Sequence, residues 1–270
     1  MRKTFTKRYR QGGPGAARLE ALGLRWLAAA PGGVRVARVV TASDSHLELE
    51  FFAPVAASEA AAERFGRALA RTHAAGAPHF GAPPPGWSGP GWIGGAPMSH
   101  LGRPGAAWGA FYAAERLLPY AAAAAKRGAL SAEGLGIIRR VARRLREGDF
   151  DSPQPALLPA GGAARLHGDL WSGNVLWTEP PAAGGAPWTG AALIDPAAHG
   201  GHAETDLAML ALFGLSHIDL VTAAYHEASP LADGWPERVG LHQLYPLLVH
   251  ACLFGGSYGA MAAAKAKRYQ

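Results

Sequence analysis

The segment Leu166–Trp177, LHGDLWSGNVLW, places a histidine, an aspartate and an asparagine within one short glycine-containing stretch. A carboxylate can orient and deprotonate a hydroxyl group, and an amide oxygen can ligate a hard divalent cation. Asp195 supplies a second carboxylate at the end of the apolar stretch LIDPA. These residue types, Asp169, Asn174 and Asp195, are those that phosphoryl transfer requires.

The spacing of His167, Asp169 and Asn174 is that of the protein-kinase catalytic loop, H-R-D-x-x-x-x-N. It predicts that Asp169 is the base, that Asn174 ligates Mg²⁺ through its amide oxygen, and that Asp195 is the second metal ligand. Asp169 and Asn174 could instead cap turns, as these residue types often do. The three residues together, with a strand that ends in Asp195, favour the catalytic interpretation. For His167 we expect a bracing role through hydrogen bonds rather than a titrating one.

The elements that must position these residues follow from the hydrophobic pattern. The N-terminal part alternates strands and helices, and the C-terminal part is mainly helical with a short β insert. The pattern predicts an α+β protein in two lobes. Strands are expected over 4–10, 34–42, 46–53 and 191–197, helices over 16–30, 58–76, 108–126, 131–147 and most of 203–270, and a long loop over 77–109.

Composition narrows the class of protein. Nearly half of the 270 residues are hydrophobic, and the net charge is +6 with a pI near 9.7. The basic residues are scattered and no nucleic-acid-binding motif is present, so we expect no nucleic-acid partner. The one cysteine, Cys252, fits a reducing cytoplasm. Neither a signal peptide nor a long apolar run is evident, so we expect a cytoplasmic monomer without membrane contact.

Several longer motifs resemble the fructosamine kinase (ketosamine-3-kinase) family. They are RLHGDLWSGNVLW, LIDPAAHGGHAETDLAMLALFG, LHQLYPLLVHACLFGGSYG, GAPHFGAPP with GWIGGAPM, and FYAAERLLPY. The resemblance runs from about Thr4 onward over nearly the whole chain. It implies a protein-kinase-like fold, ATP with Mg²⁺, and phosphorylation of the 3-hydroxyl of a ketosamine, either a small molecule or a protein-bound adduct. The family's phosphorylated product is unstable, so the resemblance also implies deglycation.

The resemblance assigns further residues motif by motif. The strand TFTK matches the family's lysine strand, which makes Lys7 the contact for the donor phosphates, and Glu20 in the next helix is expected to hold Lys7 in an ion pair. The stretch LELEFF resembles the strand that receives adenine. Glu50, Phe51 and Phe52 are therefore expected to line the adenine site.

The motif from His202 to Met209 also matches the family. It implies that His202 and Asp206 support the catalytic loop structurally. Glu204 is expected either to do the same or to face the substrate. Trp171 is a candidate platform for the sugar, with packing against a neighbouring helix as the equal alternative.

The sequence departs from the family pattern in two places. Only six residues precede Lys7, so the N-terminal lobe, residues 1–53, is expected to lack the first two strands and the glycine loop over the phosphates, whereas residues 54–270 form the helical lobe. Ala203 also stands where the family commonly has arginine. The missing loop motivates one alternative, a catalytically silent pseudokinase. A kinase for another small hydroxyl compound, such as an aminoglycoside, is a second.

Two motifs suggest other chemistries. The G-x-S-x-G pattern at 255–259 is typical of hydrolases, but no aspartate or histidine follows it. His199, His202 and Glu204 have the residue types of a transition-metal site, yet no accompanying metal motif is present. We expect neither.

Overall fold

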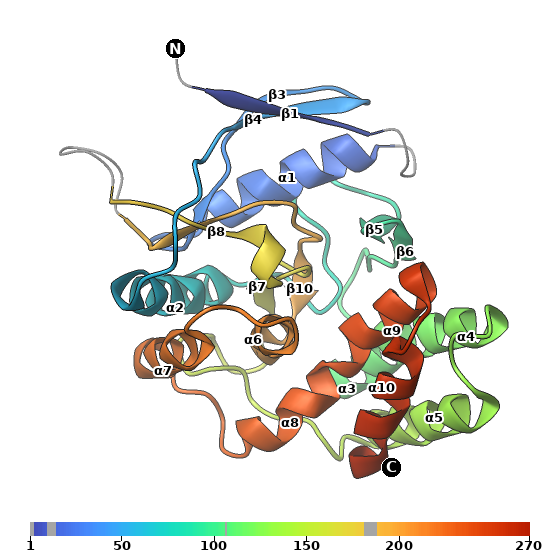
Figure 1. Cartoon of the computed structure of the whole chain (residues 1–270). Helices are drawn as coiled ribbons and strands as arrows, with labels where there is room; N and C mark the ends of the chain where they lie inside the picture. Colours follow the sequence, from blue (N-terminus) through green and yellow to red (C-terminus); the bar gives the residue numbers. More distant parts are fainter. Residues whose placement is uncertain (1–2, 10–14, 106, 181–187) are drawn as a thin grey trace.

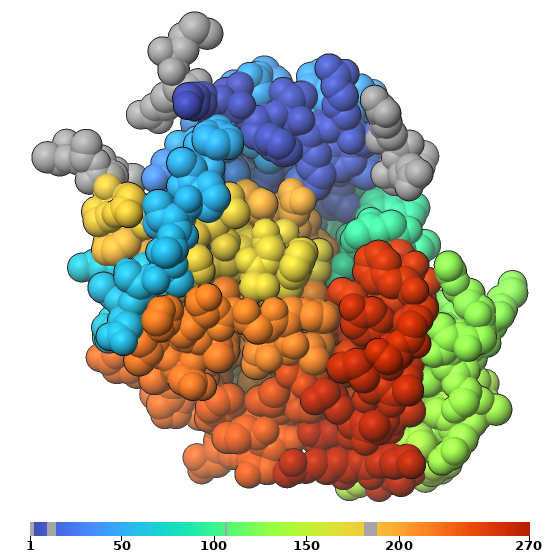
Figure 2. Space-filling view, viewed as in Figure 1, coloured from blue at the N-terminus to red at the C-terminus, as the bar shows by residue number. Residues whose placement is uncertain are grey.

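A computed structural model describes residues 3–9, 15–105, 107–180 and 188–270. An antiparallel sheet at one end of the molecule carries the lysine strand (Figure 1). Its order is β1 (Thr4–Arg8), β4 (His46–Glu50) and β3 (Val39–Ala42), and Lys7 lies opposite Leu47. Strand β1 forms one edge of this sheet within the described residues. In the space-filling view these strands form a layer over the rest of the molecule (Figure 2).

Helix α1 (Ala16–Ala28) packs beneath this sheet (Figure 1). It begins after Gly15, whose φ of 81° favours glycine, so the chain can turn into the helix there. Its apolar face buries Leu24 and Leu27, and Glu20 is buried on the same helix. The helix therefore brings an acidic side chain beneath the lysine strand. The sequence GGPG at 12–15, which favours a turn before this helix, lies mostly outside the described residues.

A second sheet joins the N-terminal part to the catalytic part. Strand β2 (Arg35–Val36) runs parallel to β9 (Ala191–Leu193), which pairs antiparallel with β8 (Val175–Trp177). The prediction of one continuous strand over 34–42 is therefore wrong, because β2 and β3 belong to different sheets. The chain leaves one sheet at Ala37, whose N–H donates to Leu193, and enters the other near Arg38, whose carbonyl accepts from Glu50. The strand predicted over 46–53 likewise ends at Glu50.

Two short antiparallel pairs complete the β structure. Strand β7 (Ala164–Leu166) pairs with β10 (His199–Gly201), directly before and after the catalytic segments. Strands β5 (Gly91–Ile93) and β6 (Ala96–Met98) form a hairpin within the region predicted as a long loop. The Gly94-Gly95 dipeptide at its turn is a hairpin signal that the sequence analysis missed.

The helices form the larger part of the fold (Figure 1). Helices α2 (Glu59–Ala74) and α5 (Ala132–Glu147) begin at serine caps. The Ser58 hydroxyl accepts a hydrogen bond from Ala61 N–H, and the Ser131 hydroxyl accepts one from Gly134 N–H. The predicted helix over 108–126 is interrupted by a π-helical turn, Tyr112–Leu117. The other α-helices are α3 (Trp108–Phe111), α4 (Leu118–Lys126), α6 (Ala203–Leu212), α7 (Ile218–Ala228), α8 (Trp235–His242), α9 (Leu244–Phe254) and α10 (Tyr258–Ala266).

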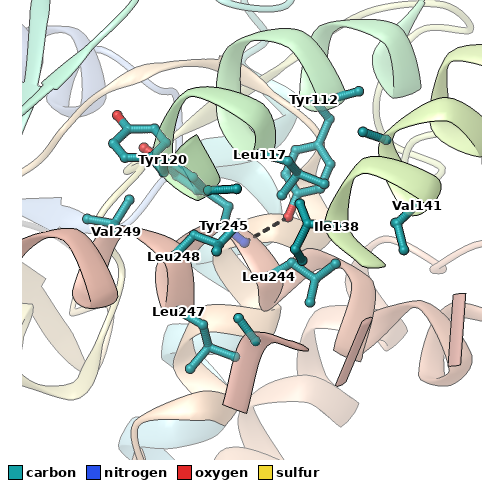
Figure 3. Packing of buried hydrophobic residues seen from close by; sticks show 14 of the residues in the cluster. Tyr112, Leu117, Tyr120, Ile138, Val141, Leu244, Tyr245, Leu247, Leu248 and Val249 are labelled. Atoms are coloured by element: carbon teal, nitrogen blue, oxygen red, sulfur yellow. Dashed lines mark hydrogen bonds between the residues drawn. The ribbon is translucent and has the colours of Figure 1, made fainter. Parts of the chain in front are cut away.

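Two large hydrophobic clusters hold these elements together. One lies among α3, α4, α5 and α9, where Tyr112 and Tyr245 are buried and Tyr245 N–H donates to the Tyr112 hydroxyl (Figure 3). The other joins α1 and the N-terminal sheet to α2, α6 and α7. Residues on both sides of the predicted boundary at 53/54 thus share one core. The α+β class, with a small strand region and a larger helical part, is confirmed. No described helix is long and apolar enough to span a bilayer.

Candidate active site

The loop after β7 is held by Asp206 at the start of α6. Its two carboxylate oxygens accept hydrogen bonds from the backbone N–H groups of His167 at 2.7 Å and Gly168 at 3.0 Å. Gly168 has a φ of 81°, and a Cβ there would lie 2.2 Å from the Ala197 carbonyl oxygen. Only glycine therefore fits this turn. The loop is fixed in the conformation that presents Asp169.

The His167 side chain links the catalytic loop to the strand that carries Asp195. Its Nε2 lies 2.8 Å from the Ile194 carbonyl oxygen, and its Nδ1 accepts a hydrogen bond from Asp169 N–H at 3.3 Å. Because Nδ1 accepts, Nε2 carries the proton. Burial lowers the pKa of His167, more than Asp206 raises it, so the ring is neutral at pH 7.

Asn174 and Asp195 lie next to each other at this junction. The Asn174 amide nitrogen donates to the Asp169 carbonyl at 2.8 Å, which leaves its amide oxygen available as a ligand. Asp195 adopts a φ of 52°, a conformation that aspartate tolerates better than most residues. The structure thus brings together an amide oxygen and a carboxylate. Oxygen donors of this kind fit Mg²⁺.

Lys7 reaches the same junction from the N-terminal sheet. Its ammonium lies 2.8 Å from the Glu20 carboxylate and 3.0 Å from that of Asp195. The predicted Lys7–Glu20 ion pair is therefore present. The Tyr9 hydroxyl donates to the same Glu20 carboxylate, a contact that the sequence analysis missed. The spacing of Lys7 and Tyr9 indicates this contact, because side chains two residues apart on an extended chain lie on one face.

A cavity of about 470 Å³ lies between the N-terminal sheet, α1, the β5–β6 hairpin and the catalytic loop. Its walls include Lys7, Glu20, Asp169 and Asp195, so the predicted base, metal ligand and phosphate contact face one space. The pKa of Asp169 is raised to about 7 because the group is buried and lies near the carboxylates of Asp195 and Asp206. A base of this pKa is suited to accept a proton near neutral pH.

The three residues predicted for adenine binding lie outside the cavity that contains Asp169. The Glu50 carboxylate is 2.7 Å from the Arg35 guanidinium, and its backbone N–H donates to the Arg38 carbonyl. The Phe51 backbone N–H donates to Lys3, and the Phe52 ring lies against Arg35. None of the three lines the cavity that contains Asp169. The backbone N–H groups of Glu50 and Phe51 are therefore already used in pairing with the neighbouring strands. Among the described contacts, only the Phe52 backbone N–H has no acceptor and could bind adenine.

Trp171 packs against the neighbouring helix. Its ring makes an edge-on contact with Phe213 at the end of α6, at 6.5 Å between centroids, and 41% of the residue is exposed. It is not among the residues that line the cavity. This geometry favours the packing alternative over the role of a sugar platform.

Glu204 corrects one expectation. It is buried, and its carboxylate accepts two hydrogen bonds from Arg238, at 2.6 and 2.9 Å, and lies 3.3 Å from His242. Burial acts to raise its pKa, but these two partners outweigh burial and lower it to about 2. The residue lines a separate groove beside α7 and α8. Glu204 therefore ties α6 to α8 and neither faces the acceptor nor braces the loop.

His202 lies in the same buried cluster. Its Nδ1 accepts from Glu204 N–H, and its Nε2 lies 3.3 Å from Ser152. The ligand atoms of His202, Glu204 and His242 lie within 4.8 Å of one another. Arg238 supplies the positive charge there, and both His202 nitrogens are engaged, so these contacts describe an ion-pair network. The metal cluster considered from the sequence included His199, which instead bonds the Ala197 carbonyl.

Comparison with known proteins decides the family. A model of the fructosamine kinase family matches residues 2–269. The chain belongs to the fructosamine kinase family. It is 33% identical over 249 residues to a probable ketoamine kinase from Synechocystis sp., an alignment that covers 90% of this chain and 75% of that protein.

Solved structures agree with this family. A candidate fructosamine-3-kinase from Thermobifida fusca is 43% identical with a TM-score of 0.86, over 99% of this chain and 85% of that one. An ADP-bound aminoglycoside phosphotransferase superposes with a TM-score of 0.54 at 12% identity, over 94% of this chain and 83% of that one, which shows the fold alone. The predicted family and the protein-kinase-like fold are confirmed. The protein is a kinase of the sugar-amine class.

Proposed function

We propose that this protein transfers the γ-phosphoryl group of ATP to the 3-hydroxyl of a ketosamine. The observation that carries the proposal is the cavity in which Asp169, with a pKa near 7, faces Lys7 and Asp195. Membership of the fructosamine kinase family supports this substrate class. Phosphate is a better leaving group than hydroxide. Elimination of phosphate from the third carbon, followed by hydrolysis of the imine that forms, would release the amine and hence lead to deglycation.

The transfer assigns a role to each residue that faces the cavity. Asp169 orients the acceptor hydroxyl and accepts its proton as the oxygen bonds to the γ-phosphorus. The bond from that phosphorus to the β-γ bridging oxygen breaks, and ADP leaves with the electron pair. Lys7, held by Glu20, contacts the donor phosphates and offsets their negative charge.

Asn174 and Asp195 would hold Mg²⁺. The fit rests on their oxygen donors and on the cation that already lies at Asp195, the Lys7 ammonium at 3.0 Å. When bound, the metal supplies positive charge next to the donor phosphates. Removal of Mg²⁺ by a chelator is accordingly expected to stop the reaction.

The expected adenine site, acceptor, oligomeric state and location are also part of this proposal. The adenine ring is expected near Phe52, on the side of β4 that joins the two parts of the chain. The acceptor is a small ketosamine or a protein-bound adduct. A monomer in the cytoplasm remains our expectation, and size-exclusion chromatography with light scattering tests the monomer.

The test is transfer by the purified chain. With Mg²⁺ and ATP it is expected to form ADP in proportion to a synthetic ribulosamine or fructosamine. Binding of Mg-ATP without transfer to any hydroxyl compound would favour the pseudokinase. Transfer to an aminoglycoside but to no ketosamine would favour the other kinase alternative.

A further inference from the structure

Tyr9 contacts both members of the Lys7–Glu20 ion pair, and none of the assigned roles uses it. Its hydroxyl donates to Glu20 Oε2, the same oxygen that lies 2.8 Å from the Lys7 ammonium. The centre of its ring lies 5.2 Å from that ammonium, within the range of a cation–π contact. Tyr9, Lys7 and Glu20 all line the cavity that contains Asp169. One side chain therefore touches the carboxylate and the cation of the pair at once.

The N-terminal sheet fixes the direction of the Tyr9 side chain. The Tyr9 backbone N–H donates to the Ser45 carbonyl at 2.9 Å, which continues the pairing of β1 with β4 by one residue. Lys7 and Tyr9 are two residues apart on this extended chain, so their side chains lie on one face. Both side chains reach Glu20 on that face, and together they join the strand to α1.

Glu20 depends on these two donors because it is buried. Only 9% of the residue is exposed. Burial raises the pKa of its carboxyl group, whereas the charge of Lys7 and the hydrogen bonds from Lys7 and Tyr9 act to lower it. Glu20 Oε1 has no hydrogen-bond partner in the described part of the chain, so both bonds converge on Oε2. Without the Tyr9 hydroxyl, Lys7 would be the one described donor to this buried carboxylate.

The position of the Lys7 ammonium is set by two carboxylates. It lies 2.8 Å from that of Glu20 and 3.0 Å from that of Asp195. An ammonium group has three N–H donors, so one remains for a phosphate oxygen after these two contacts. That donor points correctly only if Glu20 is itself held in place. The described side chain that holds Glu20, apart from Lys7, is Tyr9.

We infer that Tyr9 is a positioning residue, which keeps the Lys7 ammonium at the site of the donor phosphates through its bond to Glu20 and through its ring. The inference rests on the proposed function, which assigns Lys7 to these phosphates. Tyr9 does not itself transfer a proton. Burial and the charge of Glu20 raise the pKa of its hydroxyl, which stays protonated and remains a donor.

The first test compares Tyr9→Phe with wild type. Phenylalanine keeps the ring beside the ammonium and removes only the hydroxyl. The kcat/KM for ATP is expected to fall about tenfold, the lower end of the range for a lost hydrogen bond to a charged group, and the Kd of Mg-ATP in calorimetric titration to rise by the same factor. The acceptor KM is expected to stay unchanged. Tyr9→Leu also removes the ring and is expected to lower kcat/KM for ATP further.

Tyr269→Phe is the matched control. The Tyr269 hydroxyl donates to the Glu237 carbonyl at 2.6 Å, and Tyr269 does not line the cavity that contains Asp169. The control therefore removes one bonded hydroxyl at a place remote from the ion pair. It is expected to leave kcat/KM for ATP and the Kd of Mg-ATP unchanged.

A double-mutant cycle separates positioning of Lys7 from a direct contact with ATP. In the Lys7→Met background, Tyr9→Phe is expected to change kcat/KM for ATP less than about twofold, because the ammonium that Tyr9 positions is gone. The same tenfold fall in both backgrounds would show that Tyr9 acts independently of Lys7 and would overturn the inference. Thermal melting of each variant shows that the comparison is made between folded proteins.

The remaining outcomes separate this inference from the proposed function. An unchanged kcat/KM for ATP in folded Tyr9→Phe, with wild-type transfer intact, overturns the inference and leaves the proposed function standing. A rise in the acceptor KM as large as the loss for ATP indicates a general distortion of the cavity and also overturns it. If the wild-type chain binds Mg-ATP but transfers to no ketosamine, the proposed function fails, and the Kd values of the same variants still decide the role of Tyr9. A wild-type chain that does not bind Mg-ATP overturns both.

Discussion

Replacing Asp169 by asparagine should abolish most activity and at the same time stabilise the protein. The amide has the shape of the carboxylate but cannot accept the acceptor's proton. Loss of a general base typically lowers the rate by at least about 10². The carboxylate also destabilises the fold, because burial and the nearby carboxylates raise its pKa to about 7.

The size of the stability effect follows from the two pKa values. The unfolded chain releases this proton near pH 3.8 and the folded chain near 7, so between these values the folded state binds more protons. Stability therefore falls as the pH rises through this window, and the full loss is present above pH 7. At about 1.4 kcal/mol per pKa unit, the shift corresponds to at most about 4 kcal/mol. Asp169→Asn should gain up to this amount at pH 8 and almost nothing at pH 4.

Denaturant unfolding of wild type and Asp169→Asn between pH 4 and pH 8 measures this difference. Asp44→Asn is the matched control, because Asp44 is an exposed aspartate in the turn between β3 and β4. It should change neither activity nor the pH dependence of stability. A gain in stability for Asp169→Asn that is the same at pH 4 and pH 8 would show that the Asp169 pKa is not raised in the folded protein, and a rate loss below tenfold would show that Asp169 is not the base.

Two further variants separate the phosphate contact from the structural ion pair. Lys7→Met removes the cation between Glu20 and Asp195, so the kcat/KM for ATP should fall about 10- to 100-fold, the range for charge-assisted bonds, while the acceptor KM changes little; an unchanged kcat/KM for ATP would exclude the assigned role. Glu204→Gln leaves Arg238 without its counter-charge, so the free energy of unfolding at pH 7 should fall by about 3 kcal/mol with both KM values unchanged. The pKa of Glu204 is 4.5 in the unfolded chain and about 2 in the folded protein, so wild type should lose its extra stability over Glu204→Gln as the pH falls from 4.5 toward 2. A stability difference that does not change with pH would exclude this ion pair as its cause.

The proximity of the candidate residues to one another was the most predictable feature of the site. Asp169, Asn174 and Asp195 lie on one loop and one following strand, where local spacing limits how far apart they can be. The Lys7–Glu20 pair was predictable for a different reason, since the family resemblance supplied a contact that joins a strand to the next helix. Helix starts were predictable where a serine cap marks them, as at Ser58.

Features that depend on distant partners were not predictable from local pattern. The break between β2 and β3 exists because β2 pairs with β9, whose sequence lies far along the chain. The role of Glu204 depends on Arg238 and His242, which reach it only through the packing of α6 against α8. Trp171 and Trp92 show the same limit, because their sequence context does not say which of the two lines the cavity.

The position of the phosphate on the product distinguishes a ketosamine 3-kinase from every alternative kinase. The wild-type chain, Mg²⁺, ATP and a synthetic fructosamine are incubated together, and the product is examined by ³¹P and ¹³C NMR. We expect a phosphate ester on the third carbon of the ketosamine, formed in step with ADP and at least about 10²-fold more slowly with Asp169→Asn. Stoichiometric ADP with the phosphate on another carbon, or no ester in the presence of bound Mg-ATP, would contradict the proposed function.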